Sequence, residues 1–345
     1  MKSARKAILR SRWLTFKANR RGYVSAMILG TIFVVSLFAE VIANDKPIFV
    51  SYKDQWLFPF AVTYSEKDTF GGVLEGEADY LDPWTLKEIN AHGYAIWPLV
   101  RFSYDSINFN IDRAPSVPDS TNILGTDDQA RDVFARVLYG LRTSMLFALS
   151  LVSISSIIGV SLGALQGYYG GTLDLLMQRF IEMWHGVPML FLLIILSSIV
   201  VPSFGWILAL MLCFSWMALV DLTRAECLRA RNFDYVRAAK AMGVREHIIL
   251  FRHVLPNALV SVFTFVPFLV VGAITTLASL DFLGFGLPSG SPSLGELLQQ
   301  GKNNPQSPWL GIIGFMVLAI VLSLCLFVGE AVRDAFNPRK LQGRV

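Results

Sequence analysis

The sequence predicts an all-α integral membrane protein with six transmembrane helices and a large extracytoplasmic loop subdomain after the first span. Of its 345 residues, 54% are hydrophobic and 16% are charged, and the mean hydropathy of +0.51 is too apolar for a soluble chain of this length. Six stretches approach the roughly 20 apolar residues that cross about 30 Å of hydrocarbon. These stretches are residues 23–43, 144–166, 181–201, 204–222, 259–280 and 309–329.

Basic residues orient these spans, because Lys and Arg near span ends are retained in the cytoplasm. The leader, residues 1–22, carries eight basic residues and no acidic one, and the loop 223–258 carries seven basic residues. The predicted outer loop 281–308 has a single basic residue, Lys302. The tail, residues 331–345, adds Arg333, Arg339, Lys340 and Arg344. Six spans place the leader, the loop and the tail on one side, so both termini are predicted to be cytoplasmic.

The leader is predicted to lie on the membrane surface. Trp13 and Phe16 among its basic groups favour an interfacial helix on the inner leaflet, with a disordered basic leader as the alternative. A signal peptide is a second alternative, because Val41-Ile42-Ala43 is similar to a cleavage site. The long basic region and the nearly full-length apolar run favour a retained first transmembrane helix over 23–43.

Residues 44–137 form an acidic loop, with eight Lys or Arg against fifteen Asp or Glu. Its many aromatic residues predict a small folded core, with a loose solvated loop as the alternative. The aromatic residues are Tyr52, Trp56, Phe58, Phe60, Tyr64, Tyr80, Trp84, Tyr94, Trp97, Phe102, Tyr104 and Phe109. Near its end, Asp127, Asp128 and Asp132 raise the question of a cation site. Their spacing fits no EF-hand and no bidentate Glu follows, so we predict no metal here.

Residues 138–330 are predicted to form the five-helix core. Gly159, Gly163, Gly167 and Gly171 recur every four residues, which predicts a helix face that another backbone approaches closely. That backbone is either a second span of this chain or a partner subunit.

Two ionisable residues in the core are candidates for lining a polar pathway. Glu182 and His185 share a helix face, and Pro188 just beyond them predicts a kink. Pairing or snorkelling at the membrane surface is the alternative. Pro267 and Gly272 either bend a gating helix or are tolerated packing features.

The loop 223–258 predicts a helix–Gly–helix hairpin. Asn232 and Asp234 suit a helix start, Gly243 suits a left-handed helix end, and Pro256 disfavours helical geometry at Leu255. Small residues on one side of the first helix, Ala238, Ala239 and Ala241, would permit a close approach by a partner. An ordinary basic loop is the alternative. Further along, the glycines and prolines of 279–298 predict a re-entrant or surface turn.

Three of these segments resemble motifs of the permease subunits of ATP-binding-cassette importers, in the dipeptide and oligopeptide branch. The loop 223–258 resembles the EAA…G…LP loop including its spacing, with Arg237 in place of the leading Glu. The entrance to the second span departs from the family at Ala130, where Gly is usual. The matching residues are Ala238-Ala239, Gly243 and Leu255-Pro256; Leu124-Gly125-Thr126-Asp127; and Ser279-Leu280-Asp281-Phe282-Leu283-Gly284.

The resemblance implies a permease of the type I importer kind, whose cytoplasmic loop docks in a cleft of an ATPase subunit. The residues that the resemblance assigns to this coupling loop are Asp234, Tyr235, Arg237, Ala238, Ala239, Gly243, Arg252, His253, Leu255 and Pro256. The glycine-rich outer segment is implied to be part of the periplasmic gate. With the pathway candidates, the pathway and gate residues are Glu182, His185, Asp281, Phe282 and Gly284.

The large first loop, with Ile42-Ala43-Asn44-Asp45-Lys46-Pro47, and the segment Gln300-Gly301-Lys302-Asn303-Asn304 are similar to the YejE branch. That branch implies import of oligopeptides and of the peptide antibiotic microcin C across the bacterial inner membrane. The implied partners are a homologous permease, ATPase subunits and a periplasmic peptide-binding protein, which would contact the loop 44–137.

The motifs that are absent from the sequence exclude an enzyme in this chain. No Gly-x-x-x-x-Gly-Lys-Ser/Thr phosphate loop occurs, so ATP and Mg²⁺ are expected to be used by a partner ATPase, and this chain is expected to bind no cofactor. The four histidines have no ligand spacing, and no nucleophile elbow occurs. Cys213, Cys227 and Cys325 lie in spans or the inner loop, so no structural disulfide is expected. The net charge of +4 suits anionic lipid and argues little for nucleic acid.

Two other classes of protein remain open. A secondary transporter would need ion-coupling residues near the membrane centre and usually internal repeats, which the sequence lacks. A membrane sensor or assembly factor could use a docking loop without moving solute. ATP dependence of uptake would separate an importer from both.

Overall fold

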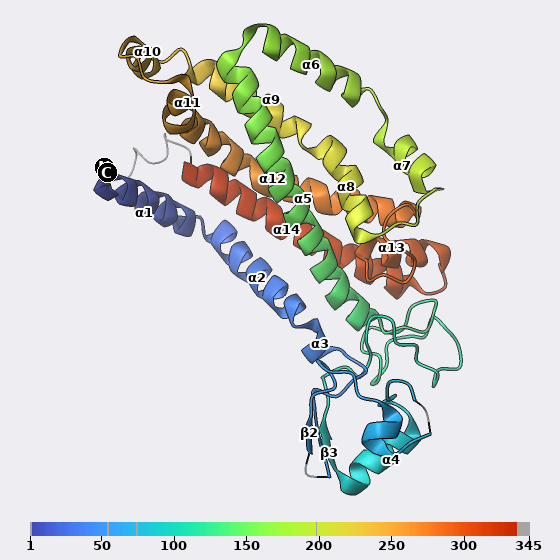
Figure 1. Cartoon of the computed structure of the whole chain (residues 1–345). Helices are drawn as coiled ribbons and strands as arrows, with labels where there is room; N and C mark the ends of the chain where they lie inside the picture. Colours follow the sequence, from blue (N-terminus) through green and yellow to red (C-terminus); the bar gives the residue numbers. More distant parts are fainter. Residues whose placement is uncertain (1, 54, 74, 198, 337–345) are drawn as a thin grey trace.

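The computed structural model describes residues 2–53, 55–73, 75–197 and 199–336. The described chain is mostly helical, with a small sheet inserted after the first helices (Figure 1). The helices before the sheet are α1 (Lys2–Ala18), α2 (Arg20–Leu37) and α3 (Ala39–Ile42). Those after it are α5 (Val133–Tyr169), α6 (Gly171–His185), α7 (Met189–Ser197), α8 (Phe204–Ser215), α9 (Met217–Ala230), α10 (Asp234–Ala241), α11 (Glu246–Ile249), the π-helical turn η2 (Leu250–Val254), α12 (Leu255–Leu283), α13 (Leu294–Asn303) and α14 (Pro308–Phe336).

The predicted six-span fold is confirmed if one broken helix is counted as a span. Five helical segments are long and apolar enough to cross a membrane, namely Arg20–Leu37, Val133–Tyr169, Phe204–Ala230, Glu246–Leu283 and Pro308–Phe336. The sixth is the pair α6 and α7, bent by 64°. This pair covers Gly171–Leu196, so the predicted bounds 181–201 are shifted. Pro188 lies at the break, where it provides no N–H for a helical hydrogen bond, so the predicted kink is confirmed.

The spans also begin or end outside their predicted bounds. Asp132 accepts a hydrogen bond from the Ala135 N–H at 2.8 Å, so α5 begins at Val133 rather than within the predicted span 144–166. The predicted loop 44–137 therefore includes the first turn of α5. The fourth span continues to Ala230, which makes it longer than the predicted 204–222.

The core of the helical part is built around α5, which packs against α8, α9 and α12, while α14 packs against α2, α12 and α13. The glycine face of α5 meets α9 of the same chain. A Cβ added at Gly163 would lie 2.6 Å from the Val220 carbonyl oxygen, and one at Gly167 would lie 2.5 Å from that of Arg224. Gly171 lies outside this contact and has a φ of +60°. Of the two alternatives left open by the sequence, internal packing is the one observed.

The segment between α3 and α5 contains a folded subdomain. Its strands are β1 (Phe49–Tyr52), β2 (Gln55–Leu57) and β3 (Gly93–Ile96), which form an antiparallel sheet in the order β2-β1-β3. The short π-helix η1 (Glu66–Phe70) and the helix α4 (Pro83–His92) complete it. Val50 pairs with Leu57 and Ala95, so one sheet face carries the buried side chains. The buried residues of this core are Val50, Tyr52, Leu57, Phe70, Ala78, Tyr80 and Ile89.

The aromatic residues of this segment contribute less to the core than we predicted. Tyr52, Tyr80 and Phe102 are buried. The exposed aromatic residues are Trp56, Phe58, Phe60, Trp84, Tyr94 and Phe109. Aliphatic residues and Phe70 fill the remaining core volume.

The subdomain lies at one end of the molecule, and α1, α10 and α11 lie at the other (Figure 1). The basic leader is helical, as predicted, and the guanidinium of Arg12 lies 4.4 Å from the centre of the Phe336 ring on α14. The Asn19 side chain caps α2 by accepting from the Gly22 N–H at 3.2 Å. The predicted tail residues Arg339, Lys340 and Arg344 lie outside the described residues.

Candidate coupling and gate sites

The predicted hairpin consists of α10, a turn at Gly243, and α11. Gly243 has a φ of +76°, which glycine adopts without a Cβ clash, so its predicted role as a left-handed helix end is confirmed. The Gly243 N–H donates to the Lys240 carbonyl at 3.0 Å and the Val244 N–H to the Ala239 carbonyl at 3.1 Å. These two bonds form a Schellman motif, which ends α10 and turns the chain back toward the core.

The start of α10 differs from the prediction. Phe233 is the residue before the helix and makes no side-chain capping bond, and Asp234 is the first helical residue. Asn232 instead donates to the Leu228 carbonyl at 3.2 Å. Asp234 still suits the first turn, because its negative charge faces the positive end of the helix dipole.

The hairpin has an apolar inner side that packs on the ends of α5 and α9. Val236 and Ile249 are fully buried in this cluster. Ala239 is also buried there, while Ala238 and Ala241 are exposed, so the prediction that all three alanines face a partner is wrong for Ala239. The other members of the cluster are Ala164, Tyr168, Cys227, Ala230, Leu250, Val254 and Ala258.

Polar contacts fasten the hairpin to the end of α5. Tyr168 on α5 donates a hydrogen bond to Glu246 on α11. Lys240 on α10 pairs with Glu246 at 3.3 Å and lies 5.0 Å from the centre of the Tyr168 ring. Sequence reasoning missed both Tyr168 and Glu246, because they are far apart in the chain and only the folded turn brings them together.

The second half of the hairpin leads directly into α12. Leu255 has helical angles, φ −58° and ψ −42°, so the prediction that Pro256 disfavours helical geometry at Leu255 is wrong. Pro256 lies in the first turn of α12, where a missing N–H costs no helical hydrogen bond. The Asn257 amide donates to the Tyr235 hydroxyl at 2.7 Å and to the His253 carbonyl at 3.1 Å, which ties α10 to this junction.

The outer side of the hairpin is exposed. Of the residues predicted to couple to an ATPase, His253 and Leu255 are half-buried. Those on the outer surface are Asp234, Tyr235, Arg237, Ala238, Gly243, Arg252 and Pro256. Met242 at the turn is 75% exposed, and Phe251 is also exposed. The hairpin therefore presents a basic and apolar outer surface, while its inner surface is fixed to α5, α9 and α12.

The pathway candidates Glu182 and His185 both lie on α6 but have different surroundings. Glu182 pairs with Arg179 at 2.7 Å on the exposed surface of α6. His185 lies 3.5 Å from the Met217 sulfur and lines a largely apolar cavity of about 240 Å³. The other residues around this cavity include Ser155, Ser215, Gly272 and Thr276. His185 lines this cavity and Glu182 does not.

The gate candidates lie at the end of α12. Asp281 is buried, accepts from the Leu287 N–H at 2.7 Å, and is hydrogen-bonded by the Ser293 hydroxyl. A Cβ at Gly286 would lie 1.8 Å from the Asp281 Oδ1, so only glycine fits the turn that wraps this carboxylate. Gly284 ends α12 with a φ of +82°. Phe282 is half-buried below Lys302, whose Nζ lies 5.3 Å from the ring centre.

The predicted outer turn continues into a helix that we did not predict. After the turn, α13 packs against α12 and α14. A Cβ at Gly295 would lie 2.3 Å from the Ala278 carbonyl oxygen, so α13 approaches α12 at van der Waals distance. The stretch 294–303 is too short for a span. Leu294, Leu297 and Leu298 at helical spacing, after Ser293 as the N-cap, are the signal that could have revealed it.

A buried ionic cluster holds α13 against the start of α5. Arg136 is fully buried and pairs with Asp127 at 3.3 Å and with Glu296 at 2.8 Å. Arg131 pairs with the same two carboxylates at 2.7 and 3.2 Å. Sequence reasoning identified Asp127 but not its partners. Among the described residues, no group of three or more His, Cys, Asp or Glu has the arrangement of a metal site.

A second buried polar group precedes α5. The Asn122 amide donates to Asp132 at 2.8 Å, and the Asn108 amide donates to Asn122 at 2.8 Å. Burial raises the pKa of the Asp132 carboxyl above its ordinary value, while the hydrogen bonds from Asn122 and the α5 backbone oppose that shift. These contacts fix the linker, residues 97–132, between the subdomain and α5.

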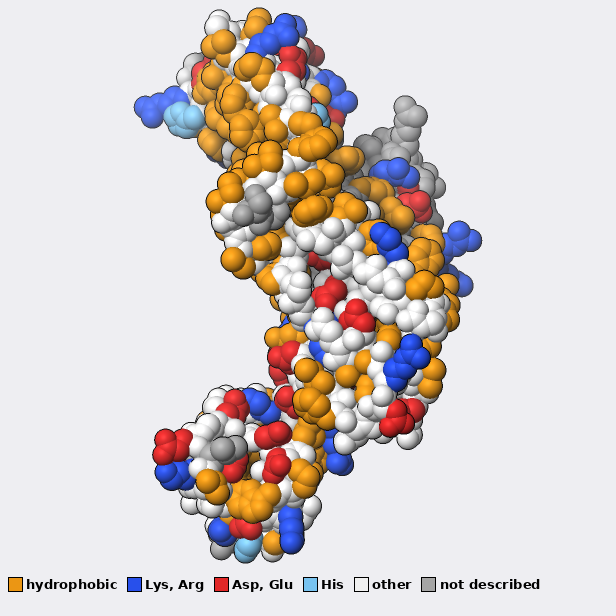
Figure 2. Space-filling view, turned by 90° about the vertical axis from the view of Figure 1, so that its right-hand side faces the viewer, with side chains coloured by type: hydrophobic (Ala, Val, Ile, Leu, Met, Phe, Trp, Pro, Cys, Tyr) orange, Lys and Arg blue, Asp and Glu red, His pale blue; other side chains and the backbone are white. Residues whose placement is uncertain are grey.

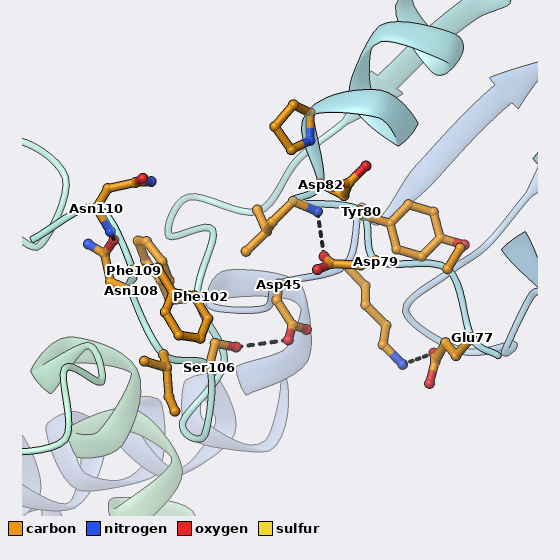
Figure 3. A pocket seen from close by; sticks show the side chains of 15 residues that line it. Asp45, Glu77, Asp79, Tyr80, Asp82, Phe102, Ser106, Asn108, Phe109 and Asn110 are labelled. Atoms are coloured by element: carbon orange, nitrogen blue, oxygen red, sulfur yellow. Dashed lines mark hydrogen bonds and ion pairs between the residues drawn. The ribbon is translucent and has the colours of Figure 1, made fainter. Parts of the chain in front are cut away.

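A cleft of about 590 Å³ separates the subdomain from this linker (Figure 3). Asp45, Glu77, Asp79 and Asp82 line it together with Phe102 and Phe109. Asp45 accepts from the Ser106 hydroxyl at 2.8 Å, and Lys46 pairs with Glu77. In the view of Figure 2, apolar side chains dominate the upper half of the molecule and acidic ones are concentrated in the middle and lower parts. The cleft is thus an acidic concavity at the end opposite the basic hairpin.

Together, the apolar spans, the hairpin packed on their ends and the glycine-rich turn around Asp281 have the architecture of a membrane-spanning transport subunit. The chain belongs to the family of inner membrane components of binding-protein-dependent transport systems, whose family model matches residues 159–342. That range contains the hairpin and the gate candidates, whereas the subdomain precedes it.

Individual relatives agree with this family. The chain is 57% identical over 331 residues to the inner membrane ABC transporter permease protein YejE of Escherichia coli (strain K12), covering 96% of this chain and 97% of the relative. It is 52% identical to the peptidoglycan transport system permease protein YejE of Agrobacterium fabrum, covering 95% and 92%. It is 36% identical to the dipeptide transport system permease protein DppC of Haemophilus influenzae, covering 64% and 75%. The chain is therefore a permease subunit of a peptide-type ABC importer.

Proposed function

We propose that this subunit passes oligopeptides from a periplasmic binding protein into the cytoplasm, driven by ATP hydrolysis in partner subunits. A second, homologous permease would complete the pathway, and both termini of this chain would be cytoplasmic. The observation that carries the proposal is the hairpin α10–α11, which is fixed to three long helices on its inner side and exposed on its outer side.

The packing of the hairpin supports a coupling role. Its contacts with Tyr168, Cys227 and Ala258 join it to α5, α9 and α12 respectively. Because η2 runs into α12 without a break, a displacement of the hairpin would be transmitted along α12 toward Asp281 at the outer end. ATP and Mg²⁺ would bind in the ATPase, and this chain would bind no cofactor.

The substrate proposal rests on the relatives. Their names include dipeptide, oligopeptide and peptidoglycan transport, and peptides are the chemistry that these substrates share. Oligopeptides, with the peptide antibiotic microcin C as one member of that class, are the substrates we propose. The subdomain cleft with its carboxylates is the surface we assign to the binding protein.

Crosslinking tests the coupling role. Met242 at the tip of the hairpin is replaced by Cys in a Cys213→Ser background, because Cys213 is exposed while Cys227 and Cys325 are buried. The matched control is Val73→Cys, at a 90% exposed position on the subdomain. In the assembled transporter, Met242→Cys labelled with a photoactivatable maleimide should crosslink to the ATPase. In intact cells the same cysteine should not react with a membrane-impermeant thiol reagent added to the medium. Val73→Cys should react with that reagent and form no such crosslink.

Uptake completes the test. Cells that contain all subunits should accumulate a labelled oligopeptide, and accumulation should stop when ATP is depleted while the proton gradient is kept. Labelling of Met242→Cys from outside the cell would contradict the orientation of the hairpin. Uptake that follows the proton gradient instead of ATP would contradict the importer.

A further inference from the structure

One face of the subdomain sheet is apolar and largely exposed. Phe49 lies at its centre, with ring centroids 6.3 Å from Trp56, 5.6 Å from Phe58 and 6.0 Å from Tyr94. The strand register places Trp56 and Tyr94 opposite Ser51, and Ile96 opposite Phe49, so these side chains share one face. We call this set the aromatic face: Phe49, Trp56, Phe58, Tyr94 and Ile96.

The aromatic face is strongly exposed. Trp56 is 74% exposed and Tyr94 is 58% exposed. The helix α4 packs on the opposite face, where Ile89 contacts Val50 and Tyr52. Ser51 is the one polar residue among the paired positions of the aromatic face, and no charged residue belongs to it. An apolar surface of this kind marks a site where another molecule covers it.

Backbone hydrogen bonds connect the sheet that carries the aromatic face to the segment that follows the first span. The Val100 N–H donates to the Ile42 carbonyl at 3.0 Å, and the Asn44 N–H donates to the Val100 carbonyl at 3.1 Å. The Ile48 N–H donates to the Ile96 carbonyl at 2.9 Å. Ile96 is four residues from Val100, so these two residues lie at most about 14 Å apart, and Val100 is itself bonded to Ile42 shortly after the first span. The sheet therefore begins close to the point where the chain leaves the first helices, which is the side of the subdomain nearest the bilayer.

The orientation of the sheet favours lipid as the occupant. In Figure 1, β2 and β3 lie on the side of the subdomain toward α2, with α4 on the other side. The nearby surface of α2 and α3 is itself apolar, with exposed Val34, Phe38 and Val41. Leu99, also exposed, lies between Ile96 and the backbone pairing with Ile42, so apolar surface continues from the span to the sheet. Trp and Tyr are the residues enriched where a protein meets the headgroup layer.

We propose that the aromatic face lies on the membrane surface and inserts its side chains into the headgroup region of the adjacent leaflet. The subdomain is then held by the chain at α3 and at the linker before α5, and also by the lipid contact of the sheet. The acidic cleft, lined by Asp79 and Asp82, remains in water. A protein partner is the competing occupant of the same face.

Fluorescence quenching tests this proposal. The full chain carries Tyr94→Cys in the Cys213→Ser background, is labelled with bimane and is placed in a lipid nanodisc. The label should lose fluorescence to lipids that carry a nitroxide near the headgroup, and it should be protected from iodide in the water. A second label at Trp56→Cys should behave in the same way. The control label at Val73→Cys should be quenched by iodide and not by the lipid nitroxide.

Two results would overturn the proposal. Quenching of the labels at 94 and 56 by iodide, with no effect of the lipid nitroxide, would place the face in water. Protection from iodide that appears only when the partner permease or the binding protein is added, without lipid quenching, would assign the face to a protein.

Discussion

Gly243 is the residue on which the shape of the coupling hairpin depends most directly. Its φ of +76° lies in the left-handed region, and a Cβ added there would meet no atom within 4 Å. A substitution therefore acts through backbone strain, which costs about 1–2 kcal/mol for an ordinary L-residue and more for a β-branched one. Asn tolerates this region better than other non-glycine residues. Replacing Gly243 by Val and by Asn therefore separates the effect of backbone strain from the effect of losing glycine itself.

We predict that Gly243→Val abolishes peptide uptake while the protein still inserts at its normal level. The reason is that Val would force the turn out of the left-handed region and displace α10 from its outer surface position. Gly243→Asn should retain a substantial part of the uptake. Uptake of a labelled peptide and immunodetection in the membrane fraction check both variants. Normal transport by Gly243→Val would contradict the coupling role of the hairpin.

Arg136 is the second residue with a large expected effect, because it is fully buried between Asp127 and Glu296. Its guanidinium also donates to the carbonyls of Gly290 and Ser291 at 3.3 and 3.0 Å. Removing one partner of a buried ion pair leaves uncompensated charge and costs about 3–5 kcal/mol. Removing one partner of a partly exposed ion pair costs little, because water screens the charge that is left.

We predict that Arg136→Met lowers the Tm of the detergent-solubilised protein strongly, by the equivalent of about 3–5 kcal/mol. The control is Arg142→Met, whose partner Glu40 lies at 2.7 Å near the surface, and which should cost at most about 1 kcal/mol. Equal shifts in Tm for the two variants would show that the cluster contributes no more than a surface pair.

At the scale of the elements, the contact between α5 and α9 depends on glycines. Gly159 and Gly163 face α9 so closely that an added Cβ would lie 2.6 Å from the carbonyl oxygens of Trp216 and Val220 respectively. Real Cβ atoms do not approach carbonyl oxygens to that distance, so a larger residue must push the helices apart. Packing without gaps is one of the forces that associate helices in lipid, where the hydrophobic effect between helices is absent.

We predict that Gly163→Val lowers the free energy of unfolding by about 1–3 kcal/mol, the usual cost of overpacking a tight core. The matched control is Gly30→Val on α2, where an added Cβ meets no atom within 4 Å. Thermal unfolding in detergent measures both. An unchanged Tm in Gly163→Val would mean that α9 can move away from α5 at little cost.

Element by element, the sequence predicted what depends on local chemistry. The break at Pro188 and the helix end at Gly243 follow from the properties of proline and glycine, and both are present. Leu255 was expected to leave the helix before Pro256, but packing of Val254 and Ala258 in the hairpin core holds it in helical geometry. Tertiary contacts therefore override the local preference at this position.

The parts that the sequence did not predict depend on residues far apart in the chain. Arg136 and Glu296 are 160 positions apart and meet only because α13 folds back against α5. For the same reason Glu182 and His185, which share a face in an ideal helix, have different surroundings once α6 packs on α9. The helix α13 is too short for a span, and its local signal, Leu294, Leu297 and Leu298 at helical spacing after Ser293, was not used.

At the scale of the whole molecule, the two candidate interaction regions lie at opposite ends. The basic hairpin is at one end with α1, and the acidic cleft is at the other with the subdomain (Figure 1). The subdomain has its own core and adds few contacts to the helices beyond α3 and the linker before α5. The helical part should therefore fold without it, which allows its role in transport to be tested by removal.

We predict that replacing residues 49–96 by two glycines leaves insertion and assembly with the ATPase intact but abolishes stimulation of ATP hydrolysis by the binding protein. The design is sterically allowed because the Ile48 N–H bonds the Ile96 carbonyl at 2.9 Å, so the two ends of the deletion meet. The pairing of Ala43 with Val100 and the cap of α5 at Asp132 remain in the shortened chain. ATPase activity of the reconstituted transporter, with and without the binding protein, gives the readout. The control is the full-length double variant Trp56→Gln, Tyr94→Gln, which keeps the acidic cleft and should keep the stimulation. Normal stimulation of the shortened chain would mean that the binding protein docks on the helical part alone.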